Sequence, residues 1–237
     1  MKVFHIDGIE VFNSIYEYLD SNMYLLFPCE GKAIIVDPHK SVECSDLLRE
    51  RRVNDVIIIL THEHSDHTSG IYWYQEQFDC KLICQKFCAT HISKERAMRP
   101  ILISFILEEQ DREKGTHQLQ KFKEDYSINT YTADITFDES YDYRIGELRI
   151  HLEHIPGHSN GSSLIIINNA FAFTGDSLMR ENPVITRFPG SNHNLYLEKT
   201  LPKLANLDSQ MVIFPGHGVP FEMKDMIVNG TLHIDYK

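Results

Sequence analysis

The histidines that follow one apolar segment constrain this chain more than any other feature. His62, His64 and His67 stand with Asp66 in the six residues HEHSDH, which only Thr61 separates from the run VIIIL at residues 56–60. A wholly apolar run of this length is typical of a strand buried on both faces. A stiff strand that ends in a tight loop can aim several side chains at one point. Imidazole and carboxylate are donors that Zn²⁺ and similar ions prefer, so this segment predicts a metal site rather than a polar surface loop.

The spacing of these residues suggests more than one ion. His62 and His64, two apart, can converge on a first ion, while Asp66 and His67 reach a second. Three further donors each stand in a tight turn after an apolar strand, with glycine beside them to let the backbone bend sharply. They are His158 in IPGHSNGSS, Asp176 in FAFTGDSL and His217 in VIFPGHG.

The rest of the pattern predicts a layered α/β fold. MYLLFP and AIIVD form a hairpin, a helix capped by Ser41 runs to Arg52, and GIYWYQEQF and FCATHI begin helices on either side of the strand KLICQ. From Thr130 the segments ITFDESYDYRIG, ELRIHLEHIPG, SSLIIIN and NAFAFTGD are strands, followed by a helix over 194–204 and the strand MVIFPG. Two groups of strands with helices between them indicate two sheets faced by helices.

One segment interrupts this alternation. Residues 88–130 are charged and mostly helical, with breaks at Pro100 and Gly115. The part PILISFIL is more apolar than a solvated helix, which favours a cap over the metal cleft or a dimer contact over a helix with its charged face in water. No repeat and no Pro/Gly/Ser-rich linker divides the chain, so we expect a single domain over 1–237.

The order of the motifs resembles the metallo-β-lactamase superfamily. THEHSDH, PGHS, TGDS and PGHG match its signature, and Asp37 in AIIVDP stands where the family has its first strand-ending aspartate. The resemblance extends from about Asn22 to Gly218. It implies a four-layer αββα sandwich, with the metal ions at one edge of the two sheets.

The resemblance also implies a ligand set. It places His62, His64 and His158 on the first ion, with Asp176 bridging to the second, whose other ligands are Asp66, His67 and His217. Because His64 replaces the glutamate typical of the flavodiiron branch, an oxygen-reducing di-iron protein is disfavoured. Two divalent ions are expected, most naturally Zn²⁺, with iron and manganese as alternatives.

Two such ions predict a hydrolase. They lower the pKa of a shared water and supply a metal-bridging hydroxide, while one ion polarises the bond under attack. Asp66 is the candidate catalytic residue, since it could orient that hydroxide and carry its proton to the leaving group. Asp37 is expected to buttress a ligand loop or a histidine NH.

The substrate is less constrained by the motifs. IPGHSNGSSLII with TGDSL resembles the glyoxalase II-like branch, which implies a small acyl substrate of the thioester or lactone class. The chain ends soon after His217, without the helical region that grips glutathione in glyoxalase II, so we do not expect glutathione specificity. The alternatives are a phosphodiesterase or nuclease of the same superfamily, a mononuclear-iron persulfide dioxygenase, and a ligand-binding regulator.

Candidate substrate contacts lie in two segments. In residues 88–130 they are Arg96, Arg99 and Tyr126. In the loop after Asp176, Arg187 and His193 could recognise a carboxylate, although Arg187 could equally pin the loop. Of the remaining histidines, His154 is the one close enough to His158 to deserve a test.

The net charge and the cysteine content indicate which partners and which cellular compartment to expect. Lys+Arg 23 against Asp+Glu 34 gives a net charge of −11, which repels nucleic acid and anionic membranes. No apolar run approaches the roughly 20 residues of a membrane-spanning helix. The five cysteines and the lack of a secretory segment favour reduced thiols, and Cys80, Cys84 and Cys88 are predicted on different elements rather than as a cluster. We therefore expect a cytoplasmic enzyme of a small molecule, with a homodimer as an open alternative.

Overall fold

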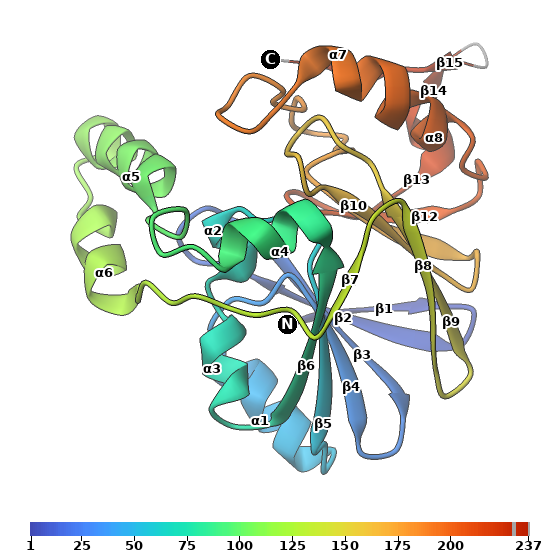
Figure 1. The fold of residues 1–237 in the computed structure, drawn as a ribbon, viewed down its shortest axis with the longest axis horizontal. Helices are drawn as coiled ribbons and strands as arrows, with labels where there is room; N and C mark the ends of the chain where they lie inside the picture. Colours follow the sequence, from blue (N-terminus) through green and yellow to red (C-terminus); the bar gives the residue numbers. More distant parts are fainter. Residues whose placement is uncertain (229–230, 237) are drawn as a thin grey trace.

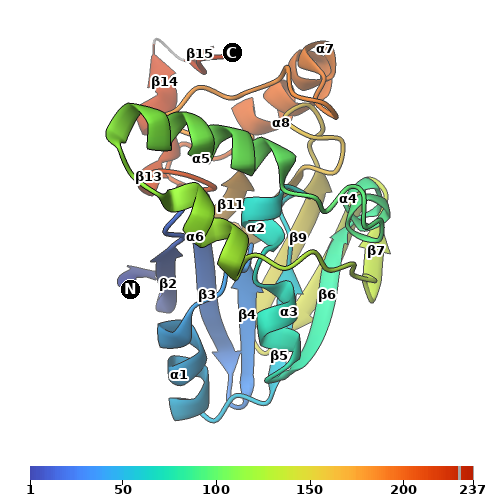
Figure 2. The same ribbon diagram turned by 90° about the vertical axis from the view of Figure 1, so that its left-hand side faces the viewer.

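Two β-sheets packed face to face, with helices on both outer sides, form the body of the protein (Figure 1). The computed structural model describes residues 1–228 and 231–236. Figure 2 shows helices α1 and α3 on one face of the first sheet, with strands of the second sheet behind it. The predicted αββα sandwich is thereby confirmed.

The seven-stranded sheet has the order β1-β2-β3-β4-β5-β6-β7 and the six-stranded sheet the order β13-β12-β11-β10-β9-β8. The strands of the first are β1 (Lys2–Ile6), β2 (Ile9–Ile15), β3 (Asn22–Cys29), β4 (Lys32–Val36), β5 (Asp55–Ile59), β6 (Asp79–Gln85) and β7 (Ile135–Phe137). Those of the second are β8 (Ser140–Ile145), β9 (Leu148–His154), β10 (Ser163–Ile167), β11 (Phe171–Gly175), β12 (Val212–Pro215) and β13 (Phe221–Glu222).

Short helices cover both sheets, and a small ribbon of two strands lies near the C-terminus. The helices are α1 (Val42–Glu50), α2 (Ser65–Thr68), α3 (Ile71–Gln75), α4 (Lys86–Ile92), α5 (Ile101–Lys114), α6 (Gln118–Asp125), α7 (His193–Leu195), the π-helix η1 (Tyr196–Thr200), α8 (Leu201–Ala205) and the 3₁₀ helix η2 (Met223–Met226). The ribbon consists of β14 (Ile227–Val228) and β15 (Thr231–Leu232). No helix among the described residues is long and apolar enough to cross a lipid bilayer.

Three hydrophobic clusters separate the four layers. The middle cluster lies between the sheets and contains Ile59 and Phe173. A second cluster packs helices α1, α3 and α4 on the first sheet, with Leu48 fully buried. The third packs η1 and α8 on the second sheet through Tyr196 and Leu204. Burial of apolar surface at three interfaces holds the strand ends that carry the histidines in one place.

The strand before HEHSDH is buried on both faces, as predicted. Val56 and Ile58 of β5 pack toward the helices, whereas Ile57 and Ile59 pack toward the second sheet. Strand β5 pairs in parallel with both β4 and β6. Its carboxyl end, and the loop that follows, therefore lie at the same edge of the sheet as those of its neighbours.

One hairpin of the first sheet lies outside the sequence prediction. Strands β1 and β2 pair from Lys2–Asn13 to Ile6–Ile9, joined by Asp7 and Gly8. Both turn residues have positive φ, +48° and +79°. Such a two-residue turn suits the right-handed twist of its strands, and Asp-Gly is its strongest signal.

The helical insertion is shorter than the predicted residues 88–130. Helix α4 belongs to the outer layer of the sandwich, because Cys88 and Ile92 are fully buried in the cluster against the first sheet. Only α5 and α6, which we call the arm, lie outside that layer (Figure 1). Pro100 directly precedes α5, and Gly115 ends it in the left-handed conformation with φ +67°, so both predicted breaks are confirmed.

The arm packs on the segment between β2 and β3. Tyr16 and Tyr18 form a small cluster with buried side chains of α5 and α6, among them Phe122. On its other side α5 leaves Ile101 and Phe105 exposed, at 73% and 60%. A role of the arm as a cap or dimer contact stays a prediction.

The thiols differ in part from the prediction. Cys80 and Cys84 share strand β6 and only Cys88 stands on another element, because β6 begins at Asp79 rather than at Lys81. All five cysteines are free. None belongs to a group of metal-type donors within the described ranges.

Candidate metal centre

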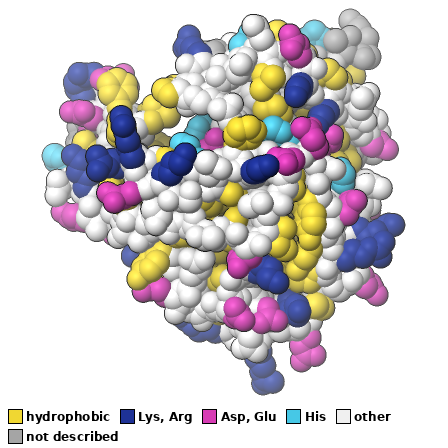
Figure 3. Space-filling model, in the orientation of Figure 1, with side chains coloured by type: hydrophobic (Ala, Val, Ile, Leu, Met, Phe, Trp, Pro, Cys, Tyr) yellow, Lys and Arg dark blue, Asp and Glu magenta, His cyan; other side chains and the backbone are white. Residues whose placement is uncertain are grey.

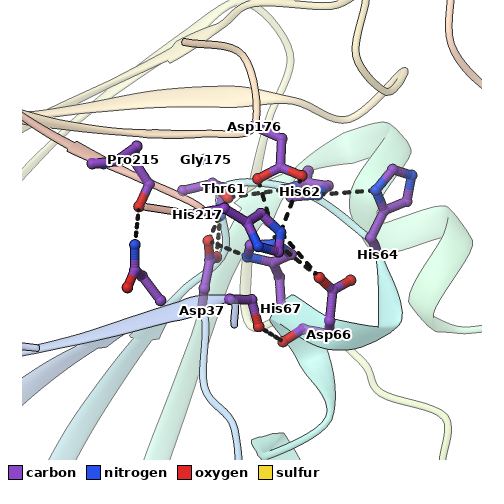
Figure 4. A network of polar contacts seen from close by, with 12 residues as sticks. Asp37, Thr61, His62, His64, Asp66, His67, Gly175, Asp176, Pro215 and His217 are labelled. Atoms are coloured by element: carbon purple, nitrogen blue, oxygen red, sulfur yellow. Dashed lines mark hydrogen bonds and ion pairs between the residues drawn. The ribbon is translucent and has the colours of Figure 1, made fainter. Parts of the chain in front are cut away.

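The predicted donor residues follow strands whose carboxyl ends meet at one edge of the sandwich. Asp37 follows β4, and the HEHSDH segment follows its parallel neighbour β5. In the other sheet Asp176 follows β11, and His217 comes shortly after its parallel neighbour β12. His158 lies in the turn between β9 and β10. Both sheets thus contribute donors to the same place, and all seven predicted ligands come together there. Figure 4 labels His62, His64, Asp66, His67, Asp176 and His217 at this place.

A first group of donors consists of three imidazoles and a carboxylate. The Nε2 atoms of His62 and His158 each lie 3.1 Å from Nδ1 of His64. Asp176 completes the group, whose ligand atoms all lie within 4.8 Å of one another. The members match the first-ion ligands that the family resemblance implied, together with the bridging aspartate.

A second group surrounds Asp66. The Nε2 atoms of His67 and His217 both lie 3.3 Å from Oδ2 of Asp66. These two histidines also face Asp176, with His67 Nε2 at 3.6 Å from Oδ1 and His217 Nε2 at 3.5 Å from Oδ2. Because His158 Nε2 lies 3.5 Å from the same Oδ2, Asp176 stands between the two groups.

Asp37 orients one of these histidines, as the sequence predicted. It accepts hydrogen bonds from the Thr61 backbone N–H at 2.7 Å and the Thr61 hydroxyl at 2.5 Å. Its Oδ2 also lies 3.0 Å from His67 Nδ1. Since the Nδ1 side of the ring faces Asp37, Nε2 is turned toward Asp66 and Asp176, which is the usual arrangement behind a metal-binding histidine.

The unsatisfied polar atoms of the site fit divalent cations. His67 Nε2 and Asp176 Oδ1 are buried without a hydrogen-bond partner. Buried polar atoms normally have partners, and a bound ion is one explanation for those that do not. Imidazole nitrogens and carboxylate oxygens are donors for zinc, iron and manganese alike, so the donor set fits such ions.

The buried charges lead to the same conclusion. Four acidic side chains are buried among the described residues, and all of them belong to this site or its support: Asp37, Glu63, Asp66 and Asp176. No lysine or arginine of the described part is buried with them. Uncompensated buried charge is costly, and two divalent cations carry the charge that would balance four carboxylates.

The pKa values of the two histidine groups differ in direction. Burial lowers the pKa of His62 and lowers that of His64 to about 3, so both rings are neutral at pH 7. Burial also opposes charge on His67 and His217, but the neighbouring carboxylates outweigh it. The charge of Asp66 raises the pKa of His67 well above its usual range, and that of Asp176 raises the pKa of His217 to about 10. The metal-free second group therefore retains protons.

A glycine allows the strand ends to approach. A Cβ atom on Gly216 would lie only 2.1 Å from Asp176 Oδ1 and 2.8 Å from the backbone carbon of Gly175. No side chain fits there without moving the carboxylate. The glycine that precedes His217 thus has the role that the sequence predicted for it.

Three of the predicted substrate contacts, Arg99, Arg187 and His193, are exposed, and among the described residues none of them has a hydrogen bond or ion pair with a donor residue. Arg99 lies 3.6 Å from Glu95, and His193 Nδ1 lies 2.9 Å from the hydroxyl of Thr186. Arg187 is exposed. Their role in substrate binding stays a prediction.

The loop after Asp176 instead meets the site through its backbone, because the carbonyl oxygen of Ile185 lies 2.9 Å from His158 Nδ1. Tyr126 is half-buried, and its hydroxyl donates to the carbonyl of Met98 at 2.9 Å. On the face drawn in Figure 3, lysine and arginine side chains gather on the arm, and histidine side chains reach the surface of the body.

His154 stands outside both donor groups. It is buried, and its Nε2 lies 2.9 Å from the carbonyl oxygen of Asn160, within the same loop that carries His158. His154 is the last residue of strand β9, and His158 lies in the turn that follows this strand. The arrangement gives it a structural role.

Sequence reasoning missed three supporting residues. Glu63 is buried behind the first group, where its carboxylate accepts hydrogen bonds from Ser159 and Gly161. Ser21 donates to the backbone carbonyl of Asp66 at 3.1 Å, and the amide of Asn22 donates to the carbonyls of Pro215 and Gly218 at 3.0 and 2.9 Å. Only Glu63 carried a usable signal, a carboxylate between two histidines of one motif.

Comparisons with known proteins agree with this geometry. Hydroxyacylglutathione hydrolase GloC of Haemophilus influenzae is 24% identical over 199 residues, covering 83% of this chain and 85% of that protein. The crystal structure of the BLEG-1 B3 metallo-beta-lactamase superposes with a TM-score of 0.70 at 22% identity, covering 90% of this chain and 94% of the other. TTHA1623, crystallised in a di-iron-bound form, has a TM-score of 0.64 at 21% identity, covering 90% and 96%.

A sequence profile of the metallo-beta-lactamase superfamily matches residues 17–217, a range that contains every donor residue of both groups. The likeness to the solved structures independently shows the same fold. The chain therefore belongs to the metallo-beta-lactamase superfamily and is a metal-dependent hydrolase.

Proposed function

We propose that this protein is a dinuclear hydrolase that cleaves a small acyl compound of the thioester or lactone class. The position of Asp176 carries the proposal, because its carboxylate faces His158 of the first group as well as His67 and His217 of the second. A carboxylate shared in this way suits a pair of ions. The resemblance to GloC, which is named a hydroxyacylglutathione hydrolase, supports an acyl substrate.

The proposed ligands are those predicted: His62, His64 and His158 for one ion, Asp66, His67 and His217 for the other, with Asp176 between them. Two divalent cations in these positions would lower the pKa of water and polarise the carbonyl group of the substrate. Zinc is the expected metal. The di-iron form of TTHA1623 makes iron a reasonable competitor, since availability often decides between metals.

Asp66 is the proposed proton carrier. His67 and His217 both contact its Oδ2, which leaves Oδ1 free of those two contacts. Burial raises the pKa of Asp66, but in the metal-free protein the charges and hydrogen bonds of His67 and His217 together outweigh it and hold that pKa well below its usual range. Oδ1 can then orient the attacking water and pass its proton toward the leaving group. A thiolate leaves near neutral pH with little help, whereas an alkoxide needs that proton.

The deciding experiment is a substrate panel with the zinc-loaded protein. It compares a small thioester, a lactone, a β-lactam and bis-p-nitrophenyl phosphate, and records oxygen uptake with a persulfide. We expect turnover of the thioester or lactone, a large loss in Asp66→Asn and none in the exposed control Asp46→Asn. Turnover confined to the phosphodiester, or oxygen uptake with one iron per chain, would contradict the proposal.

We further propose a cytoplasmic enzyme of a small-molecule substrate, with neither nucleic acid nor membrane as partner. The net charge of −11 supports the part of this proposal that concerns partners, because it disfavours binding to polyanions.

A further inference from the structure

Glu63, like Asp37, is a buried carboxylate of the site that belongs to neither donor group. It stands between His62 and His64 in the sequence and is 5% exposed. Its Oε2 accepts a hydrogen bond from the Ser159 hydroxyl at 2.9 Å, and its Oε1 accepts from the Gly161 backbone N–H at 3.3 Å. Both contacts join residues more than 90 positions apart, from one sheet of the sandwich to the other.

These contacts fix the turn that carries His158. Ser159 is the next residue, and its backbone N–H donates to the Ser162 hydroxyl at 3.1 Å, while the two hydroxyl oxygens lie 2.9 Å apart. A Cβ atom on Gly161 would lie 2.5 Å from Glu63 Oε2, so the turn approaches the carboxylate as closely as a glycine allows. Glu63 therefore tethers the His158 turn to the loop of His62 and His64.

The negative charge of Glu63 matters because the first group contains only one negatively charged ligand. Three of its four donors are imidazoles, which bind a cation as neutral groups, and its one carboxylate, Asp176, is shared with the second group. A buried negative charge behind neutral ligands strengthens the attraction for a cation in a medium of low dielectric constant.

We propose that Glu63 is a positioning residue for the first metal ion: through Ser159 and Gly161 it holds His158 against His62 and His64, and its charge favours a cation there. The inference rests on the metal centre of the proposed function. It goes beyond it by assigning a residue that touches neither the ions nor the substrate.

The test measures metal affinity rather than turnover. Full-length metal-free protein is titrated with Zn²⁺ against a chromophoric chelator, and separately with Co²⁺ to follow the visible spectrum of each site. We expect Glu63→Gln to weaken the first of the two sites about 10- to 100-fold, the usual range for residues behind metal ligands, and to leave the second unchanged. The exposed Glu50→Gln serves as the matched control. Two sites of wild-type affinity in Glu63→Gln would overturn the proposal.

Ser159→Ala separates the tether from the charge. It removes the hydroxyl but keeps the carboxylate, so we expect a smaller loss at the same site. The double variant with Glu63→Gln should lose no more than about twofold beyond Glu63→Gln alone, since the two residues act through one contact. Additive losses would contradict the tether. Circular dichroism of the metal-free variants establishes folding, and if Glu63→Gln does not fold, Ser159→Ala decides by its Co²⁺ spectrum.

Failure of this inference is distinguishable from failure of the proposed function. If the wild-type protein binds two ions but cleaves no acyl compound, the proposed substrate class is wrong, and the role of Glu63 in metal binding can still be tested. A Glu63 variant with unchanged affinities, in a protein that does cleave a thioester, removes only the role of Glu63.

Discussion

At the scale of single residues, Asp176 is the side chain on which both donor groups depend. Its two oxygens face His67 on helix α2 and the loop residues His158 and His217, and Oδ1 lacks a hydrogen-bond partner. Neutralising this carboxylate removes charge from both groups at once, whereas a change at His62 removes a ligand from one.

We predict that Asp176→Asn weakens the binding of both metal ions. The amide keeps the size of the side chain but carries no charge, so zinc content after dialysis should fall from two equivalents to less than one, with turnover reduced about 1,000-fold or more. Metal analysis by mass spectrometry with a parallel rate measurement checks this. A variant that keeps two ions and full activity would show that Asp176 does not bridge them.

Metal binding should release protons. Without metal, the pKa of His67 lies well above its usual range and that of His217 is about 10, so both rings are protonated at pH 7. Because a ligand histidine must be deprotonated, binding two Zn²⁺ ions at pH 7 is expected to release about two protons. The affinity of the second site should rise with pH until about pH 10 and fall in acid. Calorimetry in buffers of different ionisation enthalpy counts the protons, and a count of zero would contradict the assignment.

At this scale the sequence predicted what kind of residue would gather, and the resemblance implied which belonged together. The sequence could not predict the orientation of each ring. His64 turns its Nδ1 atom toward the first group, whereas His62 and His158 turn their Nε2 atoms toward it. Nor could the sequence show which side chain stands behind the donors. The contact of Glu63 with Ser159 depends on how the two sheets are packed, which no local pattern encodes.

At the scale of elements, the site depends on the segments that follow β4, β5, β11 and β12, which pair in parallel within each sheet, and on the turn after the antiparallel strand β9. The turns of His158, Asp176 and His217 were predictable from the glycines beside these donors, and the strands before them from apolar runs. Element boundaries were less so. Helix α4 was predicted to lie within the insertion that begins at Cys88, whereas its buried Cys88 and Ile92 pack it against the first sheet of the sandwich. The hairpin β1–β2 was missed although Asp7-Gly8 signalled it.

We predict that Gly216→Ala disrupts metal binding more than folding. The added methyl group must displace the Asp176 carboxylate, so zinc affinity should fall at least about 10-fold. Gly31→Ala is the control, since no atom lies within 4 Å of its Cβ position and its positive φ of +73° should cost only about 1 kcal/mol. Zinc titration and thermal unfolding of both variants test this. Equal metal affinities in the two would refute the close approach.

At the scale of the whole molecule, the candidate metal centre joins the two sheets. The loop after β5 and helix α2 that follows it supply four donors from the first sheet, and the turns after β9, β11 and β12 supply three from the second. Among the direct links between the halves beside it are the bonds from Asn22 to Pro215 and Gly218. The ions should therefore contribute to the stability of the entire sandwich.

We predict a large drop in melting temperature on chelation. A ligand that binds only the folded state at about 1,000 times its Kd adds roughly 4 kcal/mol, and two ions add correspondingly more. Differential scanning calorimetry with and without EDTA measures the effect. His158→Ala should lose only part of the metal-dependent shift. An EDTA-treated protein with an unchanged melting temperature would mean that the ions do not bridge the halves.

The origin of the donors in both sheets has a consequence for how each chain is made. As the polypeptide leaves the ribosome, HEHSDH emerges about 150 residues ahead of His217, a difference that follows from their positions in the sequence. Until β12 has joined its sheet, the early histidines lack their partners and can hold a cation only loosely. We therefore expect metal loading to be a late event in biosynthesis, with the ion chosen by what the compartment offers at that moment.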